Sequence, residues 1–264
     1  MTHRISRFTK SPVPRVCLTA YTTSMAAAMA PHVDLILVGD SVAMVVYGAE
    51  NTLEADLAMM ARHGRAVRRG APDALVVVDM PAGTYEDGPD QALASARRLM
   101  DETGCDAVKL EGGAAFEQTI ACLTQSGIPV MGHIGLLPQS VVKEGGYKIK
   151  GKSEDDIARL LNDAKAVERA GAFSLVIEGT IDKAAETVTA ALSIPTIGIG
   201  ASAACDGQIL VCDDMLGITR GRLAKFVKQY AHIGDGIEQA VQQYADDVRA
   251  RRFPDAAHLY RQAG

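Results

Sequence analysis

Eight short apolar runs, separated by longer segments of helical character, constrain the fold of this chain more than any other feature. A short apolar run that ends at a turn residue is typical of a strand buried on both faces of a parallel sheet. The predicted strands are 16–19, 35–38, 75–79, 107–110, 129–133, 174–178, 195–199 and 208–211. The predicted helices are 24–30, 54–69, 91–103, 115–125, 155–170, 183–192 and, in two pieces, 223–251.

Strict alternation of strands and helices predicts a parallel α/β architecture. Eight such units in 264 residues match the roughly 250 residues of a (β/α)8 TIM barrel, which favours a closed barrel over an open sheet. The chain has no linker or low-complexity segment, so we expect residues 1–264 to form a single barrel domain with a short N-terminal arm and C-terminal helices. The connection 134–152 is long for such a domain, and we expect a lid or binding loop there.

Polar residues and glycines mark the ends of the predicted helices. Asn51 with Glu54, and Ser153 with Asp156, have the spacing of a helix cap followed by an acid in the first turn. Four glycines follow helical segments, where a left-handed residue often ends a helix. They are Gly70, Gly104, Gly127 and Gly171.

Composition excludes several classes of protein. The net charge of −5 argues against nucleic acid as a partner, which would require a basic patch. No stretch reaches the roughly 18 apolar residues of a membrane span. The five cysteines are scattered and form no C-x-x-C motif. We therefore expect a cytoplasmic protein with neither disulfides nor a zinc site.

Ionisable residues stand at the ends of five successive predicted strands. The carboxyl ends of the strands form the active-site face of a (β/α)8 barrel, so we expect these side chains to converge. Gly39 is expected to let the backbone turn sharply into Asp40. Alone, Asp79 is equally well explained as a turn cap and His133 as a core histidine, but together so many charged groups would be expensive to bury without a function. The set comprises Asp40 with Ser41, Asp79, Lys109 with Glu111, His133, and Glu178.

This set suits enolate chemistry. Asp40 and Asp79 supply hard oxygen ligands of the kind that Mg²⁺ prefers. Lys109 and Glu111 lie two apart on one strand and face the same side, so the lysine can neutralise a substrate carboxylate or enolate while the glutamate orients a metal-bound water. Glu178 can serve as a general base. The residues alone therefore predict Mg²⁺-dependent enolisation of a small keto acid.

Nine motifs follow one another along the chain. They are V-G-D-S at 38–41, M-V-V-Y-G at 44–48, V-D-M-P at 78–81, V-K-L-E-G-G at 108–113, G-H-I-G-L-L-P-Q at 132–139, G-G-Y-K at 145–148, I-E-G at 177–179, I-G-I-G-A at 197–201 and D-G-Q-I-L-V at 206–211. In this order they resemble the ketopantoate hydroxymethyltransferase family. The resemblance covers nearly the whole chain, from Leu18 to His258.

The resemblance implies a barrel of the phosphoenolpyruvate/isocitrate-lyase type. It implies transfer of a hydroxymethyl group from 5,10-methylenetetrahydrofolate, as co-substrate, to the keto acid 3-methyl-2-oxobutanoate, giving 2-dehydropantoate in pantothenate biosynthesis. It also implies a homo-oligomer, specifically a decamer. Carried over by motif, the Mg²⁺ ligands match Asp40, Asp79 and Glu111. The substrate contacts match Ser41, Asp79, Lys109 and His133, and the catalytic residues match Glu178 as base, Lys109 and Glu111.

Two alternatives remain open from the sequence. One is a lyase or mutase of the same superfamily acting on a C–C or P–C bond. Such enzymes typically carry a catalytic cysteine in a K-x-C-G-H-type loop, which this chain lacks, and Cys122 lies in a predicted helix. The other is a non-catalytic, ring-forming barrel, against which the set of strand-end acids argues.

Overall fold

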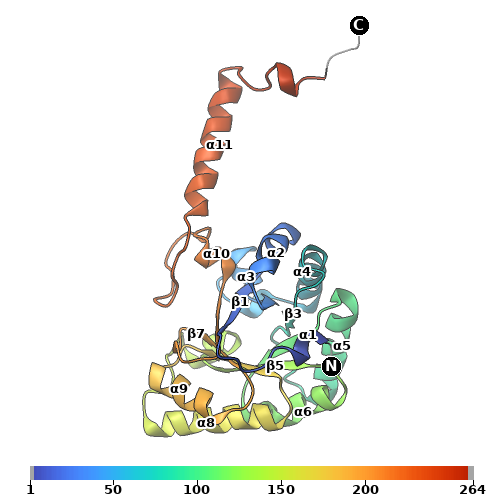
Figure 1. Cartoon of the computed structure of the whole chain (residues 1–264), viewed down its shortest axis with the longest axis vertical. Coiled ribbons are helices and arrows are strands. Elements are labelled where there is room, and N and C mark those ends of the chain that lie inside the picture. Colours follow the sequence, from blue (N-terminus) through green and yellow to red (C-terminus); the bar gives the residue numbers. More distant parts are fainter. Residues whose placement is uncertain (1–2, 261–264) are drawn as a thin grey trace. The chain divides into compact units, whose positions relative to one another are not determined.

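The structure, a computed structural model, describes residues 3–260. The chain divides into two compact units, Met1–Cys212 and Asp213–Gly264. In the first unit, eight parallel strands pair in chain order, and the last pairs with the first to close a barrel (Figure 1). The closed (β/α)8 barrel predicted from the sequence is confirmed. The single-domain organisation of residues 1–264 stays a prediction.

All eight predicted strands are present, and their bounds differ from the predicted ones by at most two residues. They are β1 Arg15–Thr19, β2 Leu35–Val38, β3 Val76–Asp79, β4 Ala107–Glu111, β5 Val130–Gly135, β6 Ser174–Glu178, β7 Thr196–Ile199 and β8 Gly207–Leu210. The runs are apolar on both faces because one face fills the barrel interior and the other packs against the helices.

The helices around the barrel pack against one another in chain order (Figure 1). They are α2 Thr23–Met29, α4 Leu57–Gly70, α5 Pro89–Thr103, α6 Glu117–Gln125, α8 Glu154–Arg169 and α9 Asp182–Ala191. Short helices are α1 His3–Ser6, α3 Val42–Val45, α7 Val141–Glu144 and α10 Cys212–Met215. All five cysteines are free. Within residues 3–260, no helix combines the length and apolarity needed to cross a membrane.

Ser153 caps the helix predicted to follow it, whereas Asn51 does not. Oγ of Ser153 accepts a hydrogen bond from the N–H of Asp156 at 3.2 Å, at the start of α8. Asn51 instead caps the short 3-10 turn Thr52–Glu54, and Asp56 caps α4. Helix α4 therefore begins three residues later than predicted, because its cap is Asp56 and not Asn51.

Three of the four glycines predicted to end helices have left-handed backbones. The φ angles are 67° at Gly104, 81° at Gly127 and 89° at Gly171. Gly70 is different, since it is the last residue of α4 itself. A Cβ at Gly70 would collide with the backbone of Thr23 in α2. This glycine is therefore required by the close approach of two helices, and its prediction as a left-handed cap is wrong.

The N-terminal arm closes the barrel at the end where the strands begin. Ile5 and Phe8 are buried and belong to the same apolar cluster as the inward-facing strand residues Cys17 and Leu35. The ring of Phe8 meets the ring of Phe173 edge-on, with centroids 6.0 Å apart. Full burial of one such side chain stabilises a fold by about 1.5–3 kcal/mol, so the arm is part of the core.

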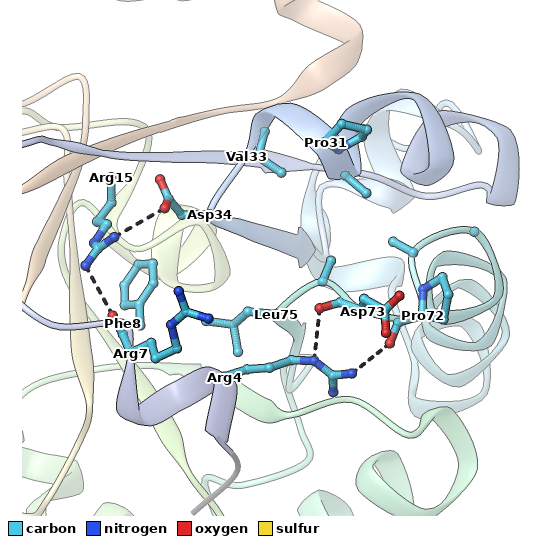
Figure 2. Close-up of a pocket in the computed structure, with 14 residues that line it drawn as sticks. Arg4, Arg7, Phe8, Arg15, Pro31, Val33, Asp34, Pro72, Asp73 and Leu75 are labelled. Atoms are coloured by element: carbon cyan, nitrogen blue, oxygen red, sulfur yellow. Dashed lines mark hydrogen bonds and ion pairs between the residues drawn. The ribbon is translucent and has the colours of Figure 1, made fainter.

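A cavity of about 590 Å³ lies at this same end of the barrel (Figure 2). The guanidinium of Arg4 donates to the backbone oxygens of Pro72 at 2.9 Å and Asp73 at 3.0 Å. Arg15 forms an ion pair with Asp34 at 3.3 Å. Arg4 thus ties the arm to the segment that precedes β3, and Arg15, at the start of β1, donates to the backbone oxygens of Arg7 and Thr9 in the arm. The cavity therefore lies at the opposite end of the strands from the predicted functional residues.

The longest element of the second unit is helix α11, Ile233–Arg249. The segment 223–232, predicted to be helical, is irregular, so this part of the prediction is wrong. The N–H of Tyr230 donates to the carbonyl of Met215 at 2.8 Å, and that of Ile233 donates to Leu216 at 3.0 Å. These backbone groups bond to a distant segment, and so they do not form the local bonds of a helix.

Candidate active site

The ionisable strand-end residues form the next layer of the barrel interior above the apolar cluster. Residues two apart on a strand face the same side, so each inward-facing core residue is followed by an inward-facing site residue. The pairs are Val77 and Asp79, Ala107 and Lys109, Met131 and His133, and Val176 and Glu178, with Glu111 following Lys109. The structure therefore brings together the residues predicted from the sequence. Of their side chains, Glu178 is the most exposed, at 16%.

Lys109 lies at the centre of the site. It is paired with Asp79 in the register of β3 and β4, and its Nζ lies 2.9 Å from Oδ1 of Asp79. Burial alone would lower the pKa of Lys109, but the carboxyl groups of Asp79, Asp40 and Glu111 raise it above its ordinary value. Lys109 is therefore a buried, permanently charged ammonium.

His133 links Lys109 to Glu178. Its Nδ1 lies 3.3 Å from Nζ of Lys109 and 3.6 Å from Oε1 of Glu111, while its Nε2 lies 3.3 Å from Oε2 of Glu178. Burial and the charge of Lys109 hold the pKa of His133 well below its ordinary value, so the ring is neutral. Because an ammonium group only donates, Nδ1 is the acceptor and the ring proton is assigned to Nε2, which lies close to Glu178.

Four carboxyl groups share this small volume with one ammonium. Burial raises the pKa of Asp79 and of Glu178 to about 7, and it also raises those of Asp40 and, strongly, Glu111. In every case the charge of Lys109 acts in the opposite direction. One positive charge does not balance four acids, so the site favours the entry of a further cation.

The donor atoms fit a hard divalent cation. Asp40, Asp79 and Glu111 offer oxygen only, and the N–H of Asp40 donates to Oδ2 of Asp79 at 3.0 Å, which keeps the two aspartates together. Oε1 of Glu111 is buried without a hydrogen-bond partner among the described residues. Within residues 3–260, no three His, Cys, Asp or Glu side chains converge closely enough to hold a metal by themselves. Such a site suits Mg²⁺, which is typically held by one or two carboxylates and keeps oxygens of water or substrate.

Ser41 and Gly39 flank Asp40 at the end of β2. Oγ of Ser41 lies 2.8 Å from the hydroxyl of Tyr21. The expected turn follows Gly39, since the N–H of Val42 donates to the carbonyl of Gly39 at 3.1 Å, but Gly39 itself has no positive φ. A Cβ there would lie 2.8 Å from Oγ of Ser41 and 3.7 Å from Oδ2 of Asp79. Gly39 is thus required for space inside the site.

Two buried residues of the site have no role predicted from the sequence. Gln139, in the 3-10 turn Pro138–Ser140, donates to Oδ2 of Asp40 at 2.8 Å. The hydroxyl of Tyr85 donates to Gln139 at 2.5 Å. Gln139 could have been noticed only as the last letter of the G-H-I-G-L-L-P-Q motif. Tyr85 lies in the loop after β3, and nothing in its local sequence marks it.

Comparison with known proteins identifies the family. The family model described as ketopantoate hydroxymethyltransferase matches residues 1–256. The chain belongs to the ketopantoate hydroxymethyltransferase family. The 3-methyl-2-oxobutanoate hydroxymethyltransferase of Mesorhizobium japonicum is 60% identical over 251 residues, covering 95% of this chain and 88% of that protein. The enzyme of the same name from Brucella suis is 50% identical over 260 residues, covering 98% and 94%.

Solved structures share the barrel fold of this chain. 2,3-Dimethylmalate lyase, a member of the PEP mutase/isocitrate lyase superfamily, aligns with a TM-score of 0.59 at 18% identity, covering 94% of this chain and 87% of that one. A phosphonopyruvate hydrolase in complex with oxalate and Mg²⁺ aligns with a TM-score of 0.57 at 12% identity, covering 93% and 88%. At these identities the likeness concerns the fold alone.

Family membership makes this chain an enzyme, a hydroxymethyltransferase. A non-catalytic barrel is therefore not supported. The lyase or mutase alternative has only a distant likeness of fold behind it, and Cys122 lies in α6 as predicted. The individual roles of Asp40, Ser41, Glu111 and the other site residues stay predictions.

Proposed function

We propose that this enzyme transfers a hydroxymethyl group from 5,10-methylenetetrahydrofolate to 3-methyl-2-oxobutanoate, giving 2-dehydropantoate. The observation that carries the proposal is the chain of contacts Asp79, Lys109, His133 and Glu178 across four neighbouring strand ends. It places a fixed positive charge and a carboxylate of raised pKa in one small volume. The carboxylate can remove a proton next to a carbonyl group, and the fixed positive charge can stabilise the negative charge that results.

Glu178 is the proposed base. Burial raises its pKa to about 7, so it is basic enough to take the C3 proton and is about half ionised at neutral pH. Nε2 of its neighbour His133 lies 3.3 Å from Oε2. Its partial exposure leaves a path from the barrel mouth to the substrate.

Lys109 supplies the fixed positive charge. Its ammonium is held at 2.9 Å from Asp79, so it needs no rearrangement to face the negative charge that develops on the keto acid. Ser41 lies at the end of β2 on the other side of Asp79, and its hydroxyl is proposed to hold the substrate carboxylate. Tyr21 orients this hydroxyl from 2.8 Å.

Asp40 and Asp79, with Glu111 beside them, are the residues proposed to hold Mg²⁺. When bound, the ion supplies a Lewis acid that polarises the keto carbonyl. Removal of the single C3 proton by Glu178 then allows C3 to form a bond to the transferred carbon of the folate. Water supplies the hydroxyl oxygen as tetrahydrofolate leaves. C3 has no further proton, so only one carbon is added.

One assay tests the proposed function. The enzyme is incubated with 3-methyl-2-oxobutanoate and 5,10-methylenetetrahydrofolate, with either Mg²⁺ or a chelator, and 2-dehydropantoate is followed by mass spectrometry. Product is expected only when both substrates and Mg²⁺ are present. Absence of product in the complete mixture would refute the reaction, and equal product with the chelator would refute only the metal requirement.

We also propose that the enzyme is a cytoplasmic homo-oligomer, with ten subunits as the expected number. Helix α11 supports association because it exposes apolar side chains spaced three or four residues apart, at Ile233, Ile237, Val241, Tyr244 and Val248. Such a stripe normally packs against a partner. Light scattering should give ten times the chain mass of 27.9 kDa, and the mass of a single chain would contradict association.

A further inference from the structure

Gln139 connects the ends of three strands through its hydrogen bonds. Its side chain is buried, and Nε2 donates to Oδ2 of Asp40 at 2.8 Å and to the carbonyl of Met80 at 3.0 Å. Its backbone N–H donates to Oε2 of Glu111 at 3.1 Å. Asp40 follows β2, Met80 follows β3, and Glu111 ends β4. One residue of the β5 connection therefore contacts two of the three acids proposed for the cation.

Tyr85 fixes the orientation of the Gln139 amide. The N–H of Glu111 donates to the hydroxyl oxygen of Tyr85 at 3.4 Å, so the hydroxyl hydrogen remains available, and it is donated to Oε1 of Gln139 at 2.5 Å. With Oε1 accepting, the two amide hydrogens must point the other way, toward Asp40 and Met80. Every polar atom of the Gln139 side chain thus has a partner, and the chain of bonds begins and ends at Glu111.

We infer that Gln139 is a positioning residue for the cation site, and this inference rests on the Mg²⁺ role in the proposed function. Gln139 binds one oxygen of Asp40 and one oxygen of Glu111, so both carboxylates are held in a single orientation before a cation arrives. The second oxygen of Glu111, Oε1, has no hydrogen-bond partner among residues 3–260. Groups that orient metal ligands in this way typically change metal affinity or activity by 10- to 100-fold when they are removed.

The position of Gln139 in the chain adds a second consequence. It lies in the connection between β5 and α8, whose far end is anchored by hydrogen bonds from Lys150 N–H to Gly179 and from Ile181 N–H to Lys150. Gln139 therefore links the carboxylates of Asp40 and Glu111 to this connection.

The experiment measures Mg²⁺ binding by titration calorimetry on the substrate-free protein. Gln139→Met keeps the length of the side chain but removes its donors and acceptor, and Tyr85→Phe removes only the hydroxyl that fixes the amide. Ser140→Ala is the matched control, because Ser140 lies in the same turn and its side chain makes no capping bond. We expect the Kd for Mg²⁺ to rise about 10- to 100-fold in Gln139→Met, to rise less in Tyr85→Phe, and to be unchanged in Ser140→Ala.

Steady-state kinetics separate positioning from a merely structural role. In Gln139→Met, the KM for Mg²⁺ should rise while kcat is largely recovered at saturating Mg²⁺, whereas loss of folded protein would lower kcat at every Mg²⁺ concentration. If Gln139→Met does not fold, the Kd of Tyr85→Phe for Mg²⁺ decides the matter. A wild-type Kd in the folded variants overturns the inference alone. Failure of the wild-type enzyme itself to bind Mg²⁺ overturns both the inference and the metal part of the proposed function.

Discussion

Replacing Glu178 with glutamine tests the proposed base with almost no change of shape. The glutamine side chain keeps the length of the glutamate, whose Oε2 lies 3.3 Å from Nε2 of His133. What disappears is the ability to take a proton. Because a positioned general base contributes about 10²- to 10⁴-fold to rate, exchange of the C3 proton of 3-methyl-2-oxobutanoate should fall by that factor.

The same substitution should stabilise the folded protein at high pH. Burial raises the pKa of Glu178 from 4.5 to about 7, so the folded state disfavours the ionised form. The contribution of Glu178 to stability is fully present below pH 4.5 and is lost as the pH rises through about 7. At about 1.4 kcal/mol for each tenfold change in proton affinity, the loss is at most about 3.5 kcal/mol. Glutamine does not ionise, so the variant does not undergo this loss of stability. It should be more stable than the wild type at pH 8 and equal to it near pH 4.5.

Two measurements check this prediction. Proton exchange at C3 is followed by NMR in D₂O without folate, and the free energy of unfolding is measured with urea in Mg²⁺-free buffer at pH 5 and pH 8. The control is Glu102→Gln, because Glu102 lies on the outer face of α5 in an exposed pair with Arg98 and should leave exchange unaltered. Undiminished exchange in Glu178→Gln would refute its role as base. A stability difference that did not grow with pH would refute the burial argument.

Three further predictions follow from the site and the core. The C3 exchange rate of the wild type should rise about tenfold per pH unit below pH 7 and level off above it, in keeping with the pKa of Glu178 near 7; a profile that is flat from pH 5.5 to 8 contradicts the assignment. Asp79→Asn should lower turnover about 100-fold or more even with excess Mg²⁺, and wild-type turnover in that assay would exclude Asp79 as a ligand. Gly132→Ala should lower the free energy of unfolding by about 1–3 kcal/mol, because its Cβ would collide with Val167 of α8; Gly236→Ala, with no atom within 4 Å, is the urea control and should cost nothing.

Much of the site could be predicted because it follows from periodicity. A parallel barrel gathers the carboxyl ends of its strands at one face, and a period of two places Asp79, Lys109 and Glu178 on the same side as the apolar residues that precede them. Each of these residues stands in a short run whose direction and end are visible locally. Their convergence therefore follows from strand order alone, before any distance is known.

Other features could not be predicted because they depend on contacts between distant parts of the chain. Gln139 meets Asp40 across 99 positions of sequence, and Tyr85 meets Gln139 across 54. Local composition shows that these residues are polar or aromatic but not which partner they face. The same reason applies to segment 223–232, where the N–H of Tyr230 bonds to the carbonyl of Met215 and not to a carbonyl one helical turn before it.

The barrel and the chemical character of its mouth follow from the amino-acid order, since both depend on the spacing of short apolar runs and on the acids that end them. The protonation state of the ionisable groups at the barrel mouth follows only from their surroundings in the folded chain. Burial beside Lys109 makes His133 neutral, and burial raises the pKa of Glu178 to about 7. Packing also explains why Gly39 and Gly70 are glycines, because at both positions a neighbouring group occupies the space of a side chain. The protonation state of a residue and the space available for its side chain depend on what surrounds it in three dimensions. Only folding brings those surroundings together.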